Sequence, residues 1–165
     1  MLTFAIAYLI SLLVFVAMDA VWLTTMGAAL YRATLGDLLA EKVRLFPAIV
    51  FYLAYPVGIA TFAVMPALRA DALGTALGYG VLFGALAYAT YDLTNFATLR
   101  AWSAHITIVD IIYGAAATGA TAVIGTPDDL VKRIREIQAL TGGFGVAMVT
   151  AGPGGTNTVT SMANA

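Results

Sequence analysis

Four long apolar runs constrain the fold of this chain more than any other feature. Each is close to the roughly 20 residues that an α-helix needs to cross the hydrocarbon core of a bilayer. The runs are Thr3–Leu23, Phe46–Leu68, Thr75–Phe96 and Ser103–Ile124. The strands of a membrane barrel would instead appear as segments of about ten residues that alternate polar and apolar positions. We therefore predict an all-α fold, a four-helix transmembrane bundle over residues 1–124 with a short polar C-terminal tail at 125–165.

Composition excludes several classes of protein. Of the 165 residues, 61% are hydrophobic and 10% are charged, whereas a soluble domain has about 45–50% apolar and about 25% charged residues. The net charge of −1 provides no basic surface, so nucleic acid is not an expected partner. The chain has no cysteine and one histidine, His105. Disulfides, thiolate metal sites and multi-histidine metal sites are therefore excluded, and we expect no metal.

The first run is predicted to be a retained span and not a cleaved signal peptide. No basic residue precedes it, and its apolar residues continue to Leu23 with Asp19 as the single charge. The apolar region of a signal peptide is shorter, at about 7–15 residues.

Small residues recur at intervals of four in the last two runs. The pairs are Gly74 and Gly78, Gly80 and Gly84, and Ala115 and Gly119. Such spacing lets the backbones of two helices approach closely in lipid. The alternative is that glycine and alanine are simply common in membrane helices. We expect close helix packing here.

The connectors carry most of the charge. If the chain threads up and down, the first and third connectors share one side, whose basic residues are Arg32, Lys42, Arg44 and Arg100. The second connector has only Arg69, although the tail adds Lys132, Arg133 and Arg135. If the tail is counted, each side has four basic residues and the positive-inside rule does not distinguish them. If the tail is left out, the rule makes the side of the first and third connectors cytoplasmic, and we favour this orientation.

Leucines in the first connector suggest a further element. They stand among polar residues, which is typical of a short helix lying on the membrane surface. The leucines are Leu30, Leu35, Leu38 and Leu39.

Three aspartates lie within the predicted spans, and the threading places them in one leaflet. Asp19 and Asp92 fall near the ends of the first and third helices, which reach the same side. Asp110 and His105 fall in the first half of the fourth helix, which starts from that side. The three acids are therefore expected to converge, with His105, in one polar cavity.

Polar and aromatic residues accompany the acids at helical spacing. Tyr88, Tyr91, Asp92 and Asn95 fall on one face of the third helix, since they are spaced i, i+3, i+4 and i+7. Trp22 follows Asp19 by three residues, and Tyr113 follows Asp110 by three. We expect these aromatic residues to support a candidate polar cluster. Its members are Asp19, Asp92, Asn95, His105 and Asp110.

Two interpretations of the acids stay open. An aspartate at the centre of a membrane costs about 2.5–3.5 kcal/mol on insertion scales, so such residues are functional candidates by default. Cationic partners are few, and at least one acid must be protonated or held by hydroxyl or amide donors. The functional interpretation is a proton-responsive or cation-binding pocket. The structural one is hydrogen bonding between helices near the interface.

Three short segments carry a resemblance. They are Asp19-Ala20-Val21-Trp22-Leu23, then Tyr91-Asp92-Leu93-Thr94-Asn95 with Arg100 following, and Val109-Asp110 with Tyr113-Gly114. Over about residues 1–124 the chain resembles a family of small bacterial four-span membrane proteins of unknown function. The resemblance implies the architecture and a multi-pass place in the cell membrane, in bacteria the inner membrane. It implies no activity. Tyr113 stands where the family pattern leads us to expect tryptophan.

The tail has other resemblances. Thr126 and Pro127 are typical of the start of a helix, and Asp128 and Asp129 favour its positive end. To about Val146 the tail resembles a C-terminal piece of luciferase-like flavin monooxygenases. From there the glycine-rich stretch ending at Asn157 is similar to a loop of thiamine-diphosphate enzymes such as acetolactate synthase.

Both enzyme resemblances are short, at about twenty residues each, and the rest of either enzyme domain is absent from the sequence. The glutamate that activates the thiamine cofactor has no counterpart, because the upstream region is apolar. We therefore expect no cofactor. A mosaic sequence and a natural tail with coincidental glycine-rich turns both remain open.

Three classes of function remain open for the bundle. The leading one is translocation of a small solute, cation or proton through the polar cluster. The second is a structural or accessory subunit whose small-residue faces pack on itself or on another membrane protein. An intramembrane enzyme is the third, but the acids lack a diagnostic paired interval, and we do not expect one. The expected partners are the lipid bilayer and a second copy of the chain or another membrane protein.

Overall fold

The computed structural model describes residues 1–126, and these residues are helical with short connectors. Helices α1 (Leu2–Met26) and α2 (Ala33–Leu35) are joined by a π-helical segment, Gly27–Arg32. Helices α3 (Leu45–Ile59) and α4 (Met65–Ala70) are joined by a second π-helical segment, Ala60–Val64. Helices α5 (Leu73–Thr98) and α6 (Ala104–Ile124) complete the bundle. The all-α prediction is confirmed for this part of the chain.

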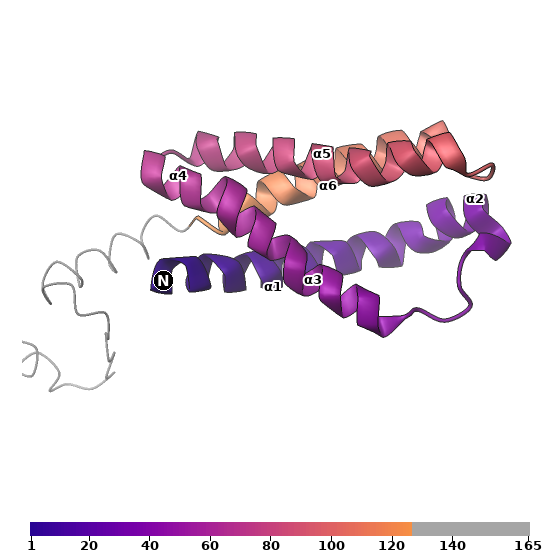
Figure 1. Ribbon diagram of the computed structural model, residues 1–165, viewed down its shortest axis with the longest axis horizontal. Helices are drawn as coiled ribbons and strands as arrows, with labels where there is room; N and C mark the ends of the chain where they lie inside the picture. Colours follow the sequence, from indigo (N-terminus) through magenta and orange to yellow (C-terminus); the bar gives the residue numbers. More distant parts are fainter. Residues whose placement is uncertain (127–165) are drawn as a thin grey trace, which may run out of the picture. The chain divides into compact units, whose positions relative to one another are not determined.

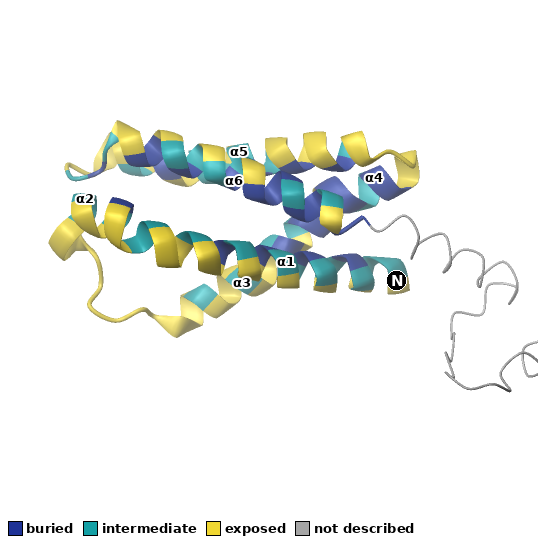
Figure 2. Cartoon of the chain, turned by 180° about the vertical axis from the view of Figure 1, so that it is seen from behind, coloured by how far each residue is buried: buried dark blue, intermediate teal, exposed yellow. Residues whose placement is uncertain are grey.

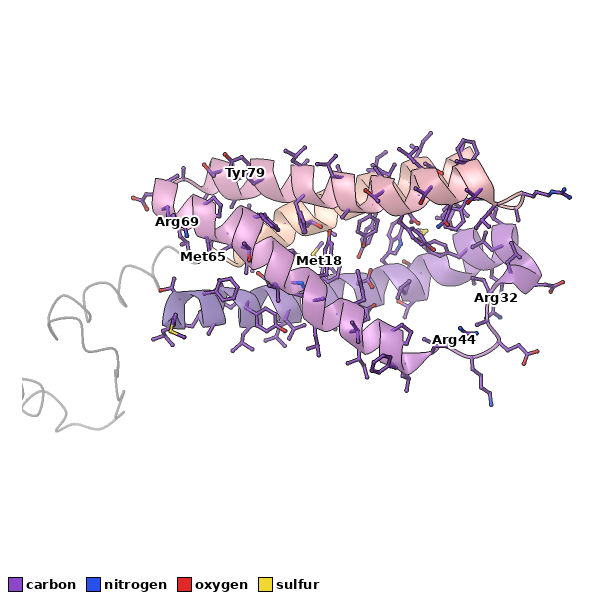
Figure 3. The ribbon with its side chains drawn as sticks, viewed as in Figure 1. Met18, Arg32, Arg44, Met65, Arg69 and Tyr79 are labelled. Atoms are coloured by element: carbon purple, nitrogen blue, oxygen red, sulfur yellow. The ribbon has the colours of Figure 1, made fainter. Side chains whose placement is uncertain are left out.

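Four helical stretches are long and apolar enough to cross a membrane. They are Leu2–Leu38, Leu45–Ala70, Leu73–Thr98 and Ala104–Ile124. Exposed apolar residues run along the outer faces of α1, α3 and α5, as expected for surfaces that meet lipid (Figure 2). The labelled cations lie at the two ends, with Arg32 and Arg44 at one and Arg69 at the other (Figure 3). This distribution fits an integral membrane protein.

The connectors are short, so consecutive spans run antiparallel. Between α4 and α5 the chain reverses within two residues, and Asp71 adopts a left-handed conformation with φ of 52°. The backbone N–H of Ala72 then donates to the carbonyl of Ala67 at 3.2 Å. At the start of α6 the Ser103 side chain accepts a hydrogen bond from the N–H of Ile106 at 3.2 Å. These local contacts define where the helices end and begin.

Helices α5 and α6 lie side by side and form the closest pair in the bundle (Figure 1). A Cβ atom built on Gly84 would lie 2.1 Å from the carbonyl oxygen of Gly114, and one on Gly80 would lie 2.9 Å from the Cα of Gly119. The predicted close packing is confirmed at Gly80, Gly84 and Gly119. A Cβ on Gly74 or Gly78 would meet nothing within 4 Å, so that pair makes no such contact.

Helix α1 packs on the bundle through aromatic side chains. The ring of Phe15 is fully buried and lies 4.7 Å from the ring of Tyr55, measured between centroids. Phe15 also contacts the rings of Phe51 and Tyr52. The Tyr8 hydroxyl donates to the carbonyl of Leu53 at 3.2 Å. Large side chains therefore hold α1 at a wider separation than the glycines hold α5 and α6.

The prediction of a surface helix in the first connector is wrong for Leu30 and Leu35. The first span continues through the π-helical segment as far as Leu38, and α2 lies beside the connector between α5 and α6 (Figure 1). Leu30 is 6% exposed and packs in a cluster with Trp102 and Ile106, and Leu35 is half-buried against the same cluster. Burial of Leu30 between helices is favourable, and this extends the helix beyond the apolar run. Leu38 and Leu39 are exposed.

Candidate functional site

Asp19 is positioned by the inward face of α1. Ala7, Ser11, Phe15 and Asp19 follow one another at intervals of four and are all buried. The Asp19 carboxylate accepts a short hydrogen bond from the hydroxyl of Tyr52 in α3 and a second, of 3.2 Å, from the hydroxyl of Tyr113 in α6. Asp19 therefore ties three spans together, with a donor on each oxygen.

Asp110 is held by a different tyrosine. It is 3% exposed on the inward face of α6 and accepts a short hydrogen bond from the hydroxyl of Tyr31. That hydroxyl in turn accepts a hydrogen bond of 3.0 Å from Nε1 of Trp22. Tyr31 belongs to the π-helical segment after α1, so the extension of the first span brings this donor to the site. The result is a chain of hydrogen bonds from Trp22 through Tyr31 to Asp110.

Asp92 differs from the other two acids. It lies in α5, is 0% exposed, and neither of its carboxylate oxygens has a hydrogen-bond partner among residues 1–126. A buried polar group without a partner is uncommon, because the protein does not replace the hydrogen bonds that the group makes in water. The sequence marked Asp92 as an intramembrane acid but gave no sign that it would lack donors.

The structure brings the three acids into one region. Asp92 and Asp110 interact electrostatically, as do Asp110 and Asp19. Tyr113, one helical turn after Asp110, bonds directly to Asp19. No ion pair joins any of the three to a lysine, arginine or histidine of the described residues. Within residues 1–126, no cationic side chain therefore balances these carboxylates.

Aromatic rings line this region. The rings of Trp22 and Tyr113 stack at 4.0 Å between centroids with an interplanar angle of 11°. The half-buried Tyr88 meets Tyr113 edge to face at 6.0 Å, and its ring lies over Gly114. Gly114 is required here, because a Cβ at that position would lie 2.2 Å from the Tyr88 ring. The aromatic residues link the Asp19 and Asp110 networks into one cluster.

A shallow apolar pocket of about 400 Å³ borders the Trp22–Tyr113 stack. It is lined by Ala17, Met18, Val21, Trp22 and Tyr113. Since its walls are apolar, the pocket suits a hydrocarbon group better than a hydrated ion.

The other predicted members of the cluster are placed differently. His105 is exposed at the second residue of α6, in contrast to the three buried acids. Asn95 is half-buried. Tyr91 is 58% exposed and contacts the ring of Trp102 edge to face, so it does not share the buried face of Asp92. Adjacent residues on a helix are about 100° apart, which separates Tyr91 from Asp92.

Sequence reasoning missed two donors of the site, Tyr31 and Tyr52. Tyr31 falls beyond the predicted end of the first run at Leu23, and its place in the site depends on the continuation of the first span. Tyr52 lies one helical turn before Tyr55 in an apolar run, and this pair of hydroxyls on one helix face could have indicated that Tyr52 is a donor. Both residues donate to carboxylates from other helices, a pairing that no local pattern specifies.

The described residues contain no group of three or more histidine, cysteine, aspartate or glutamate side chains placed to hold a metal ion. The arrangement suits binding or movement of a proton, or of a small cation held by one or two carboxylates. The tail segments that resemble flavin and thiamine enzymes lie outside the described residues.

Comparison with known proteins identifies one family to which the chain is similar. A family model described as "Predicted membrane protein (DUF2177)" matches residues 4–127. No curated protein and no solved structure matches the chain. The matched range contains all four spans and the three acids, and most of the tail lies outside it.

Proposed function

We infer that this chain, which belongs to that family of predicted membrane proteins, is a small carrier. Its carboxylate cluster would bind the protons or small cations that it moves across the bilayer. The observation that carries the inference is the set of three buried acids, drawn from α1, α5 and α6, without a paired cation in the described residues.

The energetic cost of the acids supports this function. An intramembrane aspartate costs up to about 2.5–3.5 kcal/mol on insertion scales, the full amount applying at the bilayer centre. The bundle has another source of cohesion, since Gly80, Gly84 and Gly114 let α5 and α6 pack closely. A purely structural bundle therefore gains little from Asp92, which bonds to no other span within residues 1–126.

Hydrogen bonding between helices explains only part of the cluster. Asp19 and Asp110 accept bonds from tyrosines of other spans, and such bonds stabilise a membrane bundle. Asp92 makes no bond of this kind within the described residues. Its presence is better explained by a ligand that binds to it during transport.

The test is flux through liposomes that contain the purified full-length chain. Proton flux is followed with a pH-sensitive dye under an imposed membrane potential, and sodium and potassium flux are measured in parallel. We expect flux in the wild type, and its loss in Asp92→Asn and Asp110→Asn. Asp37→Asn is the matched control, because Asp37 is exposed in the last turn of the first helical stretch. Wild-type flux of all three ions equal to that of protein-free vesicles would refute the carrier function.

An accessory subunit is the second candidate, and one observation favours it. Gly74 and Gly78 lie on the exposed side of α5, with open space where their Cβ atoms would be. This pair suits the close approach of another helix, from a second copy or from another membrane protein. Such a subunit would show no flux, and Gly78→Leu would reduce its self-association in detergent, measured by light scattering.

A further inference from the structure

Among residues 1–126, Asp92 is the acid of the cluster that has no hydrogen-bond donor to stabilise its charge. Tyr52 and Tyr113 donate to Asp19, and Tyr31 donates to Asp110. Asp92 is fully buried, and no donor among residues 1–126 reaches either oxygen. An ionised carboxylate in such surroundings is strongly disfavoured unless a cation or a proton neutralises it.

The packing of α5 on α6 indicates what lies opposite Asp92. Gly84 faces Gly114 and Thr118, and Tyr88 lies over Gly114. Because the two helices are antiparallel, one further turn along α5 places Asp92 opposite the turn of α6 that carries Thr107 and Asp110. The Thr107 hydroxyl already donates to the Ser103 carbonyl and accepts from Trp102 Nε1, each at 3.1 Å.

Within residues 1–126, three titratable groups interact with Asp92. They are Asp110 from α6, Tyr31 from the π-helical segment and Tyr91 from α5 itself. None of these groups is a cation. Within the described residues, the charged group that acts on Asp92 is Asp110, which has the same sign of charge.

A proton fits this position better than a larger cation. A metal ion needs several oxygen ligands, and the described residues contain no group of three acidic or histidine side chains placed to bind one. The apolar pocket is lined by residues of α1 and α6, and Asp92 is not among them. A proton needs one carboxylate oxygen and no additional space.

We propose that Asp92 is the residue at which the cluster binds its proton, while Asp110 remains ionised beside it because the Tyr31 hydroxyl stabilises its charge. On proton uptake the Asp92 carboxylate becomes a neutral carboxyl group, and on release the proton leaves to water and the carboxylate returns. This assignment rests on the proposed function, since it names the ligand and the binding residue of the same site.

The test is infrared spectroscopy of the full-length protein in liposomes, in H2O and in D2O, across a pH series. A protonated carboxyl group has a C=O stretching band that shifts in D2O, so it is distinguishable from amide bands. We expect this band in the wild type at neutral pH. Asp92→Asn should remove it, Asp110→Asn should change the pH at which it disappears, and Asp37→Asn should leave it unchanged.

Asparagine has nearly the shape of a neutral carboxyl group, so Asp92→Asn is expected to fold, with a circular dichroism spectrum like that of the wild type. Absence of the band from the wild type, or its survival in Asp92→Asn, would overturn the assignment. If the band depends on Asp92 but the wild type carries no ion, the proton site stands and the carrier function fails. If the wild type carries protons and Asp92→Asn carries them equally well, the carrier stands and the assignment to Asp92 fails.

Discussion

At the scale of single residues, the three aspartates are chemically identical but differ in how many hydrogen-bond donors surround them. Asp19 has a tyrosine donor on each oxygen, Asp110 has one tyrosine donor, and Asp92 has none within the described residues. A hydroxyl that donates to a buried carboxylate stabilises its charged form, and desolvation acts in the opposite direction. Within residues 1–126, the tyrosine hydroxyls therefore determine that Asp19 and Asp110, but not Asp92, form hydrogen bonds between helices.

The first prediction concerns the donors of Asp19. Tyr52→Phe removes one of its two hydrogen bonds and keeps the aromatic ring, so the free energy of unfolding should fall by about 1–2 kcal/mol. Chemical unfolding in mixed detergent micelles measures the change. Tyr79→Phe is the control, because Tyr79 is 50% exposed on α5 (Figure 3), and its effect should stay within about 0.5 kcal/mol. Equal effects of the two substitutions would show that the Tyr52 bond adds no stability.

At the scale of elements, the two halves of the bundle are packed by different means. Helices α5 and α6 approach closely because glycines face each other along their contact. Helix α1 is held through Phe15 and through the Trp22–Tyr113 stack. A wider contact made of large side chains leaves room for the apolar pocket beside Trp22 and Tyr113.

The second prediction tests the close contact between α5 and α6. In Gly84→Ala the new Cβ would overlap the carbonyl oxygen of Gly114 and the Thr118 side chain, so unfolding free energy should fall by about 1–3 kcal/mol. Gly78→Ala is matched, since it lies in the same helix with open space around it. It should be neutral or stabilising by up to about 1 kcal/mol, because alanine favours a helix more than glycine does. A tolerated Gly84→Ala would mean that the two helices are farther apart.

At the scale of the whole molecule, the described part has four helical stretches long and apolar enough to cross a membrane, with cations at both ends. The first and third connectors lie at the same end of the bundle, because Leu30 near the end of the first span packs against Trp102 of the connector that precedes α6. This contact places Arg100 and the first connector on the same side.

The third prediction is the resulting topology. Single cysteines are informative because the natural chain contains none. Glu41→Cys and Arg100→Cys should react with an impermeant thiol reagent from one side of the membrane, and Asp71→Cys from the other. Labelling in intact cells and in inverted vesicles separates the two sides. Reaction of all three positions from one side would contradict four spans.

The apolar runs alone determined the number and type of the elements, because lipid requires about twenty apolar residues for each helical crossing and this requirement is local. The intervals of four likewise predicted the contact at Gly80 and Gly84, while Gly74 and Gly78 show that spacing does not specify which pair meets a neighbour.

Tertiary structure decided the composition of the candidate site. The threading predicted that Asp19, Asp92 and Asp110 share one leaflet, but their donors come from other helices. Tyr31 reaches Asp110 because the first span continues through a π-helical segment, and Tyr52 reaches Asp19 across the contact with α3. The rotation of each helix about its axis also exposes His105 and Tyr91 and buries Asp92. That rotation depends on packing between helices, which no local pattern in the sequence encodes.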